Sequence, residues 1–309
     1  MNNPEPATGG YSAADEVGVK RKRRTRFERM RIALAKAPLS AWFGLIVVSC
    51  YVVVALFAPL LAPYGEADIF PTPYAAWGGE HFFGTDQIGR DILTRMIYGA
   101  RNTMGIALVT TFLSFLIGGT LGLIAAISRG WTDQLLSRFV DVLMAIPSLI
   151  FALMLLSIFG STISSLIIII AVLDSTRVFR LTRSVAVNVV VMDYVEAARL
   201  RGEKLGWIMR REILPNILPP LIAEFGLRFS FVFLTIAALS FLGVGIQPPT
   251  ADWGSMVREN ASLIQFAKYD IKAGLTPLLP AAAIALLTVA VNFIVDWFLH
   301  QTSGLRDDG

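Results

Sequence analysis

Long apolar stretches, separated by shorter polar ones, fill the sequence from residue 40 onward. Each approaches the roughly 20 residues that an α-helix needs to cross a bilayer. The stretches cover approximately 40–63, 103–127, 139–159, 165 onward, 217–244 and 275–299. This pattern predicts an all-α, polytopic membrane protein with six transmembrane helices.

The polar regions between these stretches predict the organisation of the chain. We expect a disordered, polybasic cytoplasmic N-terminus at 1–39. A first span and an extracytoplasmic segment follow at 40–101, the main transmembrane domain at 102–300, and a short cytoplasmic tail at 301–309.

Composition supports a membrane protein. Hydrophobic residues make up 55% of the 309 residues and charged residues only 16%, whereas soluble domains carry about 25% charged residues. The net charge of +4 could also indicate a nucleic-acid partner, but most Lys and Arg residues flank the apolar stretches. Their positions favour a lipid membrane, and not nucleic acid, as the partner.

The basic residues also predict an orientation. Nine of them lie between Lys20 and Lys36, immediately before the first apolar stretch, and further arginines lie between Arg177 and Arg211. Because cytoplasmic segments carry the excess of Lys and Arg, we expect both termini and the stretch Tyr194–Pro220 in the cytoplasm.

One helix is predicted ahead of the second apolar stretch. Two pairs of opposite charges are four residues apart, and Ile88, Ile92 and Met96 would share a face. The pairs are Asp86 with Arg90 and Asp91 with Arg95. The spacing predicts an amphipathic helix on the outer membrane surface, with ion pairs worth a few tenths of a kcal/mol each.

Charged residues also occur inside the apolar stretches, where they are costly unless they are paired or face a cavity. Asp174 and Arg177 are three residues apart, and Glu224 and Arg228 are four apart. Side chains at these spacings meet on one helix. The four residues are either structural ion pairs or the lining of a transport pathway, and the pattern leaves both alternatives open.

Small residues and proline predict how the spans pack and bend. Gly118, Gly119 and Gly122 lie within the second apolar stretch, where small residues allow helices to approach closely in lipid. Pro147 lies within the third stretch and is expected to kink it.

The stretch Tyr194–Pro220 is charged and amphipathic and lies between the fourth and fifth apolar stretches. One helical face is predicted from residues three to four apart, namely Val195, Ala198, Gly202, Leu205 and Met209. A glycine within a helix costs about 1 kcal/mol relative to alanine, so Gly202 predicts a turn or a close contact. We expect a short helix, a break, a second short helix and a restart of the chain at Pro215. A simpler alternative is an amphipathic loop on the membrane surface.

The residue types in this stretch resemble the cytoplasmic EAA loop of permease subunits of bacterial ABC importers. The matching residues are Glu196, Ala197, Ala198, Gly202, Leu214 and Pro215. The chain departs from the family at Glu203 and Lys204, where small residues are commoner. In that family the loop docks into the ATPase subunit, and the resemblance implies the same role for these residues.

Other segments resemble one branch of the same family. Phe83–Arg101 and the run from Phe241 to Gly254 are similar to the C-type permeases of dipeptide, oligopeptide and nickel importers. The resemblance implies an inner-membrane permease for peptides or related small solutes, with residues 102–300 as its ABC permease domain. It implies four kinds of interaction: a second permease subunit, two ATPase subunits, an extracytoplasmic substrate-binding protein, and ATP bound by the ATPase subunits.

Enzymatic motifs are absent from the sequence. It contains no GxxxxGK[ST], GxGxxG, HExxH, CxxC or GxSxG pattern, and its two histidines are far apart. We therefore expect neither an enzyme, nor a metal site, nor a cofactor bound by this chain. Two other classes stay open: a self-contained secondary transporter or channel, and a non-transporting membrane scaffold.

Overall fold

The computed structural model describes residue 35 and residues 37–303. The chain divides into two units, residues 1–37 and a compact unit at residues 38–309. Most of the predicted polybasic N-terminus, 1–39, and most of the predicted tail, 301–309, lie outside the described residues.

The described part of the compact unit is helical and contains no β-strand beyond two isolated bridges. Its helices are α2 (Leu39–Leu56), α3 (Ala58–Leu61), α4 (Ile92–Ser128), α5 (Gly130–Ala145), α6 (Ser148–Phe159), α7 (Ile163–Val190), α8 (Asp193–Leu200), α9 (Leu205–Ile208), η1 (Met209–Ile213), α10 (Leu214–Phe241), α11 (Trp253–Asn260), η2 (Ala261–Phe266), α12 (Ile271–Leu275) and α13 (Leu278–Ser303). The predicted all-α class is confirmed.

Four helical segments of the described chain are long and apolar enough to cross a membrane. They are Leu39–Leu56, Ile92–Ser128, Leu205–Phe241 and Ile271–Gln301, and α5 with α6 makes a fifth if this bent pair counts as one span. Helix α7 is 28 residues long but carries one aspartate and three arginines. The chain is therefore polytopic, whereas six spans stay a prediction.

The third predicted span differs from the expectation. Helices α5 and α6 meet at 88°, so Pro147 separates two helices instead of kinking one. Proline lacks an N–H and disfavours helical geometry in the residue before it, and Ile146 is extended, with φ −92° and ψ 132°. The predicted polar connection before this span is also mostly helical, because α5 begins at Gly130 directly after a turn at Arg129.

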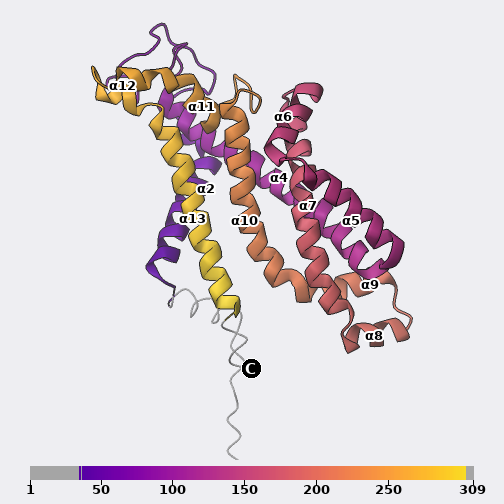
Figure 1. Ribbon diagram of the computed structural model, residues 1–309. Coiled ribbons are helices and arrows are strands. Elements are labelled where there is room, and N and C mark those ends of the chain that lie inside the picture. The colour runs from indigo at the N-terminus through magenta and orange to yellow at the C-terminus, as the bar shows by residue number, and fades with distance from the viewer. Residues whose placement is uncertain (1–34, 36, 304–309) are drawn as a thin grey trace, which may run out of the picture. The chain divides into compact units, whose positions relative to one another are not determined.

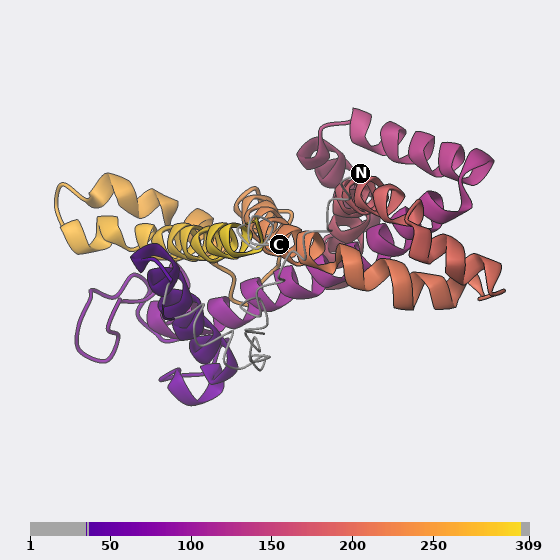
Figure 2. The same cartoon turned by 90° about the horizontal axis from the view of Figure 1, so that it is seen from below.

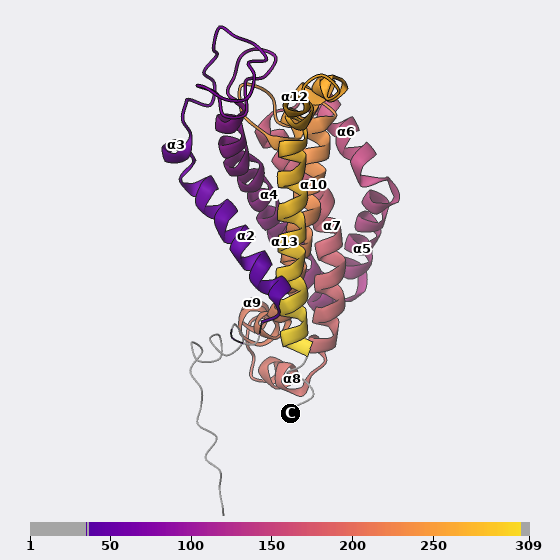
Figure 3. The same ribbon diagram turned by 90° about the vertical axis from the view of Figure 1, so that its left-hand side faces the viewer.

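Figures 1 and 3 show α11 and α12 at one end of the bundle and α8 and α9 at the other. Viewed along the bundle, α13 lies beside α2 and α10, whereas the helices between residues 130 and 213 gather on the other side (Figure 2). Helix α4 joins the two groups, because it packs against α2 and α10 as well as α5 and α7. The most extensive of these contacts is with α7.

Glycine allows this close contact between α4 and α7. A Cβ at Gly118 would overlap the carbonyl oxygen of Ser175, and one at Gly122 would lie 2.8 Å from the carbonyl oxygen of Phe179. Gly119 faces open space instead. The predicted role in helix packing therefore holds for Gly118 and Gly122 but not for Gly119.

Candidate functional site

The 194–220 loop (Tyr194–Pro220) contains α8, a turn, and the first part of a long helix. Helix α8 ends at Leu200, and Gly202 occupies the turn with φ +78°. The second short helix does not end in a break, since α9, η1 and α10 run on as one helical segment, Leu205–Phe241. Pro215 lies in the first turn of α10, a position where its missing N–H is tolerated. The predicted restart of the chain at Pro215 is therefore wrong.

The buried face of the loop differs from the predicted one. Val195 and Ala198 are buried as expected, but Gly202 and Leu205 are exposed. Ile208 and Ile213 take their place. The predicted periodicity fails because the turn at Gly202 changes the direction of the chain, so positions on either side do not share one helical face.

This buried face fixes the loop to the ends of two other helices. Val195, Ala198 and Ile213 belong to one apolar cluster with Ile127 of α4 and Val190 of α7. The loop is therefore packed against the bundle on one side. Its position depends on α4 and α7 as well as on α10.

The opposite side of the loop is exposed. Of the six residues predicted to couple the loop to an ATPase, Ala198 is buried and Leu214 is half-buried, whereas the exposed members are Glu196, Ala197, Gly202 and Pro215. A Cβ at Gly202 would meet no atom within 4 Å. Gly202 is therefore needed for its left-handed backbone, and the alternative of a close contact is not realised among the described residues.

The charged residues of the spans form one cluster between α7 and α10. Arg228 Nε lies 2.7 Å from Glu224 Oε1, and Arg228 Nη1 lies 3.6 Å from Asp174 Oδ1. Arg177 Nη1 is 3.8 Å from the same Asp174 oxygen. The hydroxyl of Ser114 on α4 donates to Asp174 over 3.1 Å. Both predicted local pairs are present, and Asp174 additionally joins three helices.

Two further arginines of α7 pair with α5. Arg180 donates to Asp141 over 2.5 Å, and Arg183 forms two hydrogen bonds with Asp133. Sequence spacing could not show these partners because they are 39 and 50 residues away. The sequence indicates these pairs only in that the two segments carry opposite charges.

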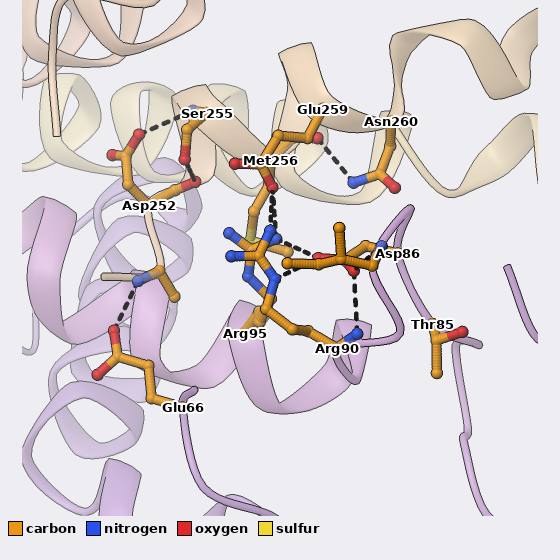
Figure 4. A network of polar contacts seen from close by, with 12 residues as sticks. Glu66, Thr85, Asp86, Arg90, Arg95, Asp252, Ser255, Met256, Glu259 and Asn260 are labelled. Carbon is orange, nitrogen blue, oxygen red and sulfur yellow. Dashed lines mark hydrogen bonds and ion pairs between the residues drawn. The ribbon is translucent and has the colours of Figure 1, made fainter. Parts of the chain in front are cut away.

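A second cluster lies at the other end of the bundle, in the cap, which we define as residues 64–103 and 251–260. Asp86 accepts from Arg90 Nε over 2.7 Å and from Arg95 Nη1 over 2.6 Å. Glu259 of α11 accepts from Arg90 over 2.7 Å and from Arg95 over 2.5 Å. Figure 4 shows the two arginines between these carboxylates. All four side chains are buried.

This cap corrects the predicted surface helix. Residues 83–91 are loop, and helix α4 begins only at Ile92. Asp91 does not pair with Arg95; instead its side chain accepts from the Thr94 backbone N–H as a helix cap and contacts His81 Nδ1 at 3.0 Å. A capping interaction of this kind is worth about 1 kcal/mol, more than the surface ion pair that the spacing suggested.

Asp252 anchors α11 to α4 inside the cap. Its carboxylate accepts from the Ser255 backbone N–H over 2.8 Å and from the Thr103 hydroxyl over 3.1 Å. Burial raises the pKa of the Asp252 carboxyl, an effect that the hydrogen bonds from Ser255 and Thr103 partly offset. Trp253 beside it is buried and donates to the Met96 carbonyl over 2.9 Å. Nothing in this polar arrangement resembles a metal centre, and residues 37–303 hold no group of three metal-ligating side chains.

Comparison with known proteins places these features in a family. A family model described as the binding-protein-dependent transport system inner membrane component matches residues 118–301, more than half of the chain. The chain belongs to this family. A second model, the N-terminal transmembrane domain of oligopeptide transport permease C, matches residues 39–76.

Curated relatives of the family cover most of the chain. The dipeptide transport system permease protein DppC of Alkalihalophilus pseudofirmus is 36% identical over 265 residues, covering 85% of this chain and 83% of the relative. The di/tripeptide transport system permease protein DppC of Pseudomonas aeruginosa is 36% identical over 272 residues, covering 86% and 84%. These matches confirm the predicted resemblance to C-type permeases.

A solved structure shares the fold. It is an inward-facing form of the MetNI methionine ABC transporter, with a TM-score of 0.51 and 18% identity, covering 67% of this chain and 97% of that one. Taken with the family match, these findings make the chain a multi-pass permease subunit of an inner-membrane ABC importer, a transport protein and not an enzyme. In this family ATP is used by partner subunits.

Proposed function

We propose that this permease imports peptides or related small solutes, and that ATPase subunits drive it through the 194–220 loop. The named relatives are peptide permeases, which supports the substrate class. The residues that we assign to coupling are Glu196, Ala197, Ala198, Gly202, Leu214 and Pro215.

One structural observation carries this proposal. The exposed loop continues without a break into the helical segment Leu205–Phe241, and its buried face contacts α4 and α7. A force applied to the loop therefore acts directly on a span. The π-helical turn η1 lies inside the loop, between α9 and α10, and such turns often occur at functional sites.

The proposed assembly follows from the two ends of the bundle. The loop faces the cytoplasm with both termini, as the basic residues predict, and two ATPase subunits bind there. The cap then faces outward and receives a substrate-binding protein. A second, homologous permease subunit completes the pathway, so that closure of the ATPases moves the loops and opens the pathway outward.

The charge cluster disfavours a self-contained secondary transporter. Ion coupling would require a carboxylate that changes its charge or ligand during transport, and the spans offer Asp174 and Glu224. Both lie within ion-pair distance of Arg228, so each carboxylate already has a cationic partner within this chain. Uptake that persists without the ATPases and collapses with the proton gradient would favour this alternative.

The coupling role can be tested with two matched glycines. Gly202 and Gly130 both have left-handed backbones, with φ +78° and +61°, and a Cβ added at either residue would meet no atom within 4 Å. Gly202→Trp should abolish ATP-driven uptake in proteoliposomes, because the side chain would obstruct the ATPase contact. Gly130→Trp carries the same backbone strain outside the loop and should retain most uptake.

Membrane insertion and complex assembly are measured for both variants. Normal uptake by Gly202→Trp, or equal loss in the two variants, would contradict the coupling assignment.

A further inference from the structure

Arg177 is the cation of the charge cluster that lies farthest from a carboxylate oxygen. Arg180 and Arg183 each bind a carboxylate of α5 closely, and Arg228 lies 2.7 Å from Glu224. The nearest carboxylate oxygen to Arg177 is 3.8 Å away, and that oxygen is shared with Arg228. This separation is too long for a hydrogen bond. Arg177 therefore has donors to spare.

The side chain of Arg177 also borders two cavities, the first between α6, α7 and α10 and the second between α5, α6 and α7. One, of about 130 Å³, is lined by Asp174, Thr235 and Ser148 among others. The second, of about 330 Å³, lies at the α5–α6 bend and is also lined by Ser148. Arg177 and Ser148 line both cavities, and 43% of the Arg177 side chain is exposed.

The position of Arg177 requires an explanation. It lies near the middle of α7, which we predict to be the fourth span, and a cation inside a membrane is costly unless it faces a partner or a water-filled cavity. Helix α6 begins at Ser148 beside the same cavities, and helix N-termini carry partial positive charge. The N-terminus of α6 and the guanidinium of Arg177 therefore both contribute positive potential to these cavities.

We propose that Arg177 binds the carboxylate of an anionic or zwitterionic solute on its way through this permease. The inference rests on the proposed transport function and names a chemical group that the pathway recognises. A guanidinium can hold a carboxylate through two parallel hydrogen bonds. Asp174, on the same helix and 3.8 Å away, keeps Arg177 oriented and limits its affinity, so that a bound solute can leave.

The test uses a reporter cysteine beside Arg177. Cys50 is the only cysteine of the chain, so Cys50→Ser with Ser148→Cys gives one reactive thiol lining both cavities. The assembled transporter is treated with an anionic and with a cationic methanethiosulfonate, and the ratio of the two reaction rates is measured. We expect this ratio to fall on the order of tenfold when Arg177→Gln removes the charge, and to persist in Arg177→Lys.

Arg180→Gln is the matched control. It removes an equal charge one turn away on the same helix, from a residue already bound to Asp141 at 2.5 Å, and should leave the ratio unchanged. An equal fall in Arg180→Gln, or a thiol that reacts with neither reagent, would overturn the proposal.

Competition then identifies the anion. Acetate should slow the anionic reagent, whereas acetamide, which is neutral and similar in shape, should not. If the anionic reagent were slowed only when phosphatidylglycerol replaces phosphatidylcholine in the bilayer, the site would bind a lipid phosphate, which would contradict a solute site. A reaction rate that acetate does not change would also contradict it.

These readouts need no imported solute. Normal labelling in a chain that fails to import with ATP would contradict the proposed function alone. ATP-driven import without any charge preference at residue 148 would contradict the Arg177 site alone.

Discussion

The cap and the 194–220 loop lie at opposite ends of one bundle and differ in whether their charged side chains are buried and paired. In the cap, Asp86, Arg90, Arg95 and Glu259 are buried and bind one another. In the loop the charged side chains are exposed or half-buried, and within the described part of the chain no ion pair joins them. Both segments connect spans, so their position in the chain does not explain the contrast.

The difference indicates which end is complete in this chain alone. A buried ionic network needs its members in place, because removing one partner leaves an uncompensated charge. An exposed charged surface that is packed on its other side can accept a partner without any rearrangement of the core. The cap is therefore a fixed structural element, and the loop is the surface on which we propose that an ATPase acts.

The largest effect should come from breaking the cap. Glu259→Gln leaves Arg90 and Arg95 with only Asp86 as a buried counter-charge, and should lower the free energy of unfolding by about 3–5 kcal/mol. Thermal unfolding of the assembled transporter in detergent measures this loss. Asp141→Asn breaks an exposed pair of similar distance and should cost only about 0–1 kcal/mol. Similar losses in the two variants would remove the basis of the comparison.

Glycine replacements compare the packing of the two ends. A Cβ at Gly254 in the cap would overlap the carbonyl oxygen of Ala237, whereas at Gly202 it would meet nothing. Gly202→Ala should cost roughly 1–2 kcal/mol from its left-handed backbone alone. Gly254→Ala should cost more, because backbone atoms must move. Unfolding temperatures in the reverse order would show that the loop is the more tightly packed segment.

Acidity should affect the cap through Asp252. Its pKa is raised by burial, so the folded state holds this proton more tightly than the unfolded state does. The resulting stability is fully present below the unfolded pKa, about 3.9, and is lost as pH rises through the folded pKa. Asp252→Asn should flatten this part of the pH profile of unfolding. An unchanged profile would show that folding does not change the pKa of Asp252.

The smallest effect on stability is expected in the loop. Arg210 and Arg211 are exposed, and replacing each with Gln should change the free energy of unfolding by no more than about 0.5 kcal/mol. ATP-driven uptake should nevertheless fall, because these charges lie on the loop that we propose to contact the ATPase. A double variant that unfolds at a much lower temperature would place these residues in a structural role instead.

Local patterns predicted a large part of this structure. The apolar stretches correspond closely to α2, α4, α10 and α13, and the spacing of Glu224 and Arg228 correctly predicted their ion pair. Such features depend on a single helix, whose periodicity the sequence displays directly. The family could likewise be identified from the residues of the loop.

Long-range contacts could not be predicted in this way. Arg95 and Glu259 are separated by 164 residues, and no spacing rule connects them. Asp91 has the spacing to Arg95 that predicts an ion pair, but the pair does not form. Its carboxylate instead caps α4, where the backbone N–H of Thr94 is a buried donor. The arginines of α7 similarly find their partners on α5, 39 and 50 residues away in the sequence.

Cross-linking from the loop tests the central claim most directly. In a Cys50→Ser chain, Ala197→Cys places one thiol on the exposed side of α8, and Glu80→Cys places a control thiol at the exposed surface of the cap. With a short bifunctional reagent, residue 197 should cross-link to an ATPase subunit with a yield that changes on ATP binding, and residue 80 should not. Failure of residue 197 to reach an ATPase subunit in a transporter that imports with ATP would contradict the account.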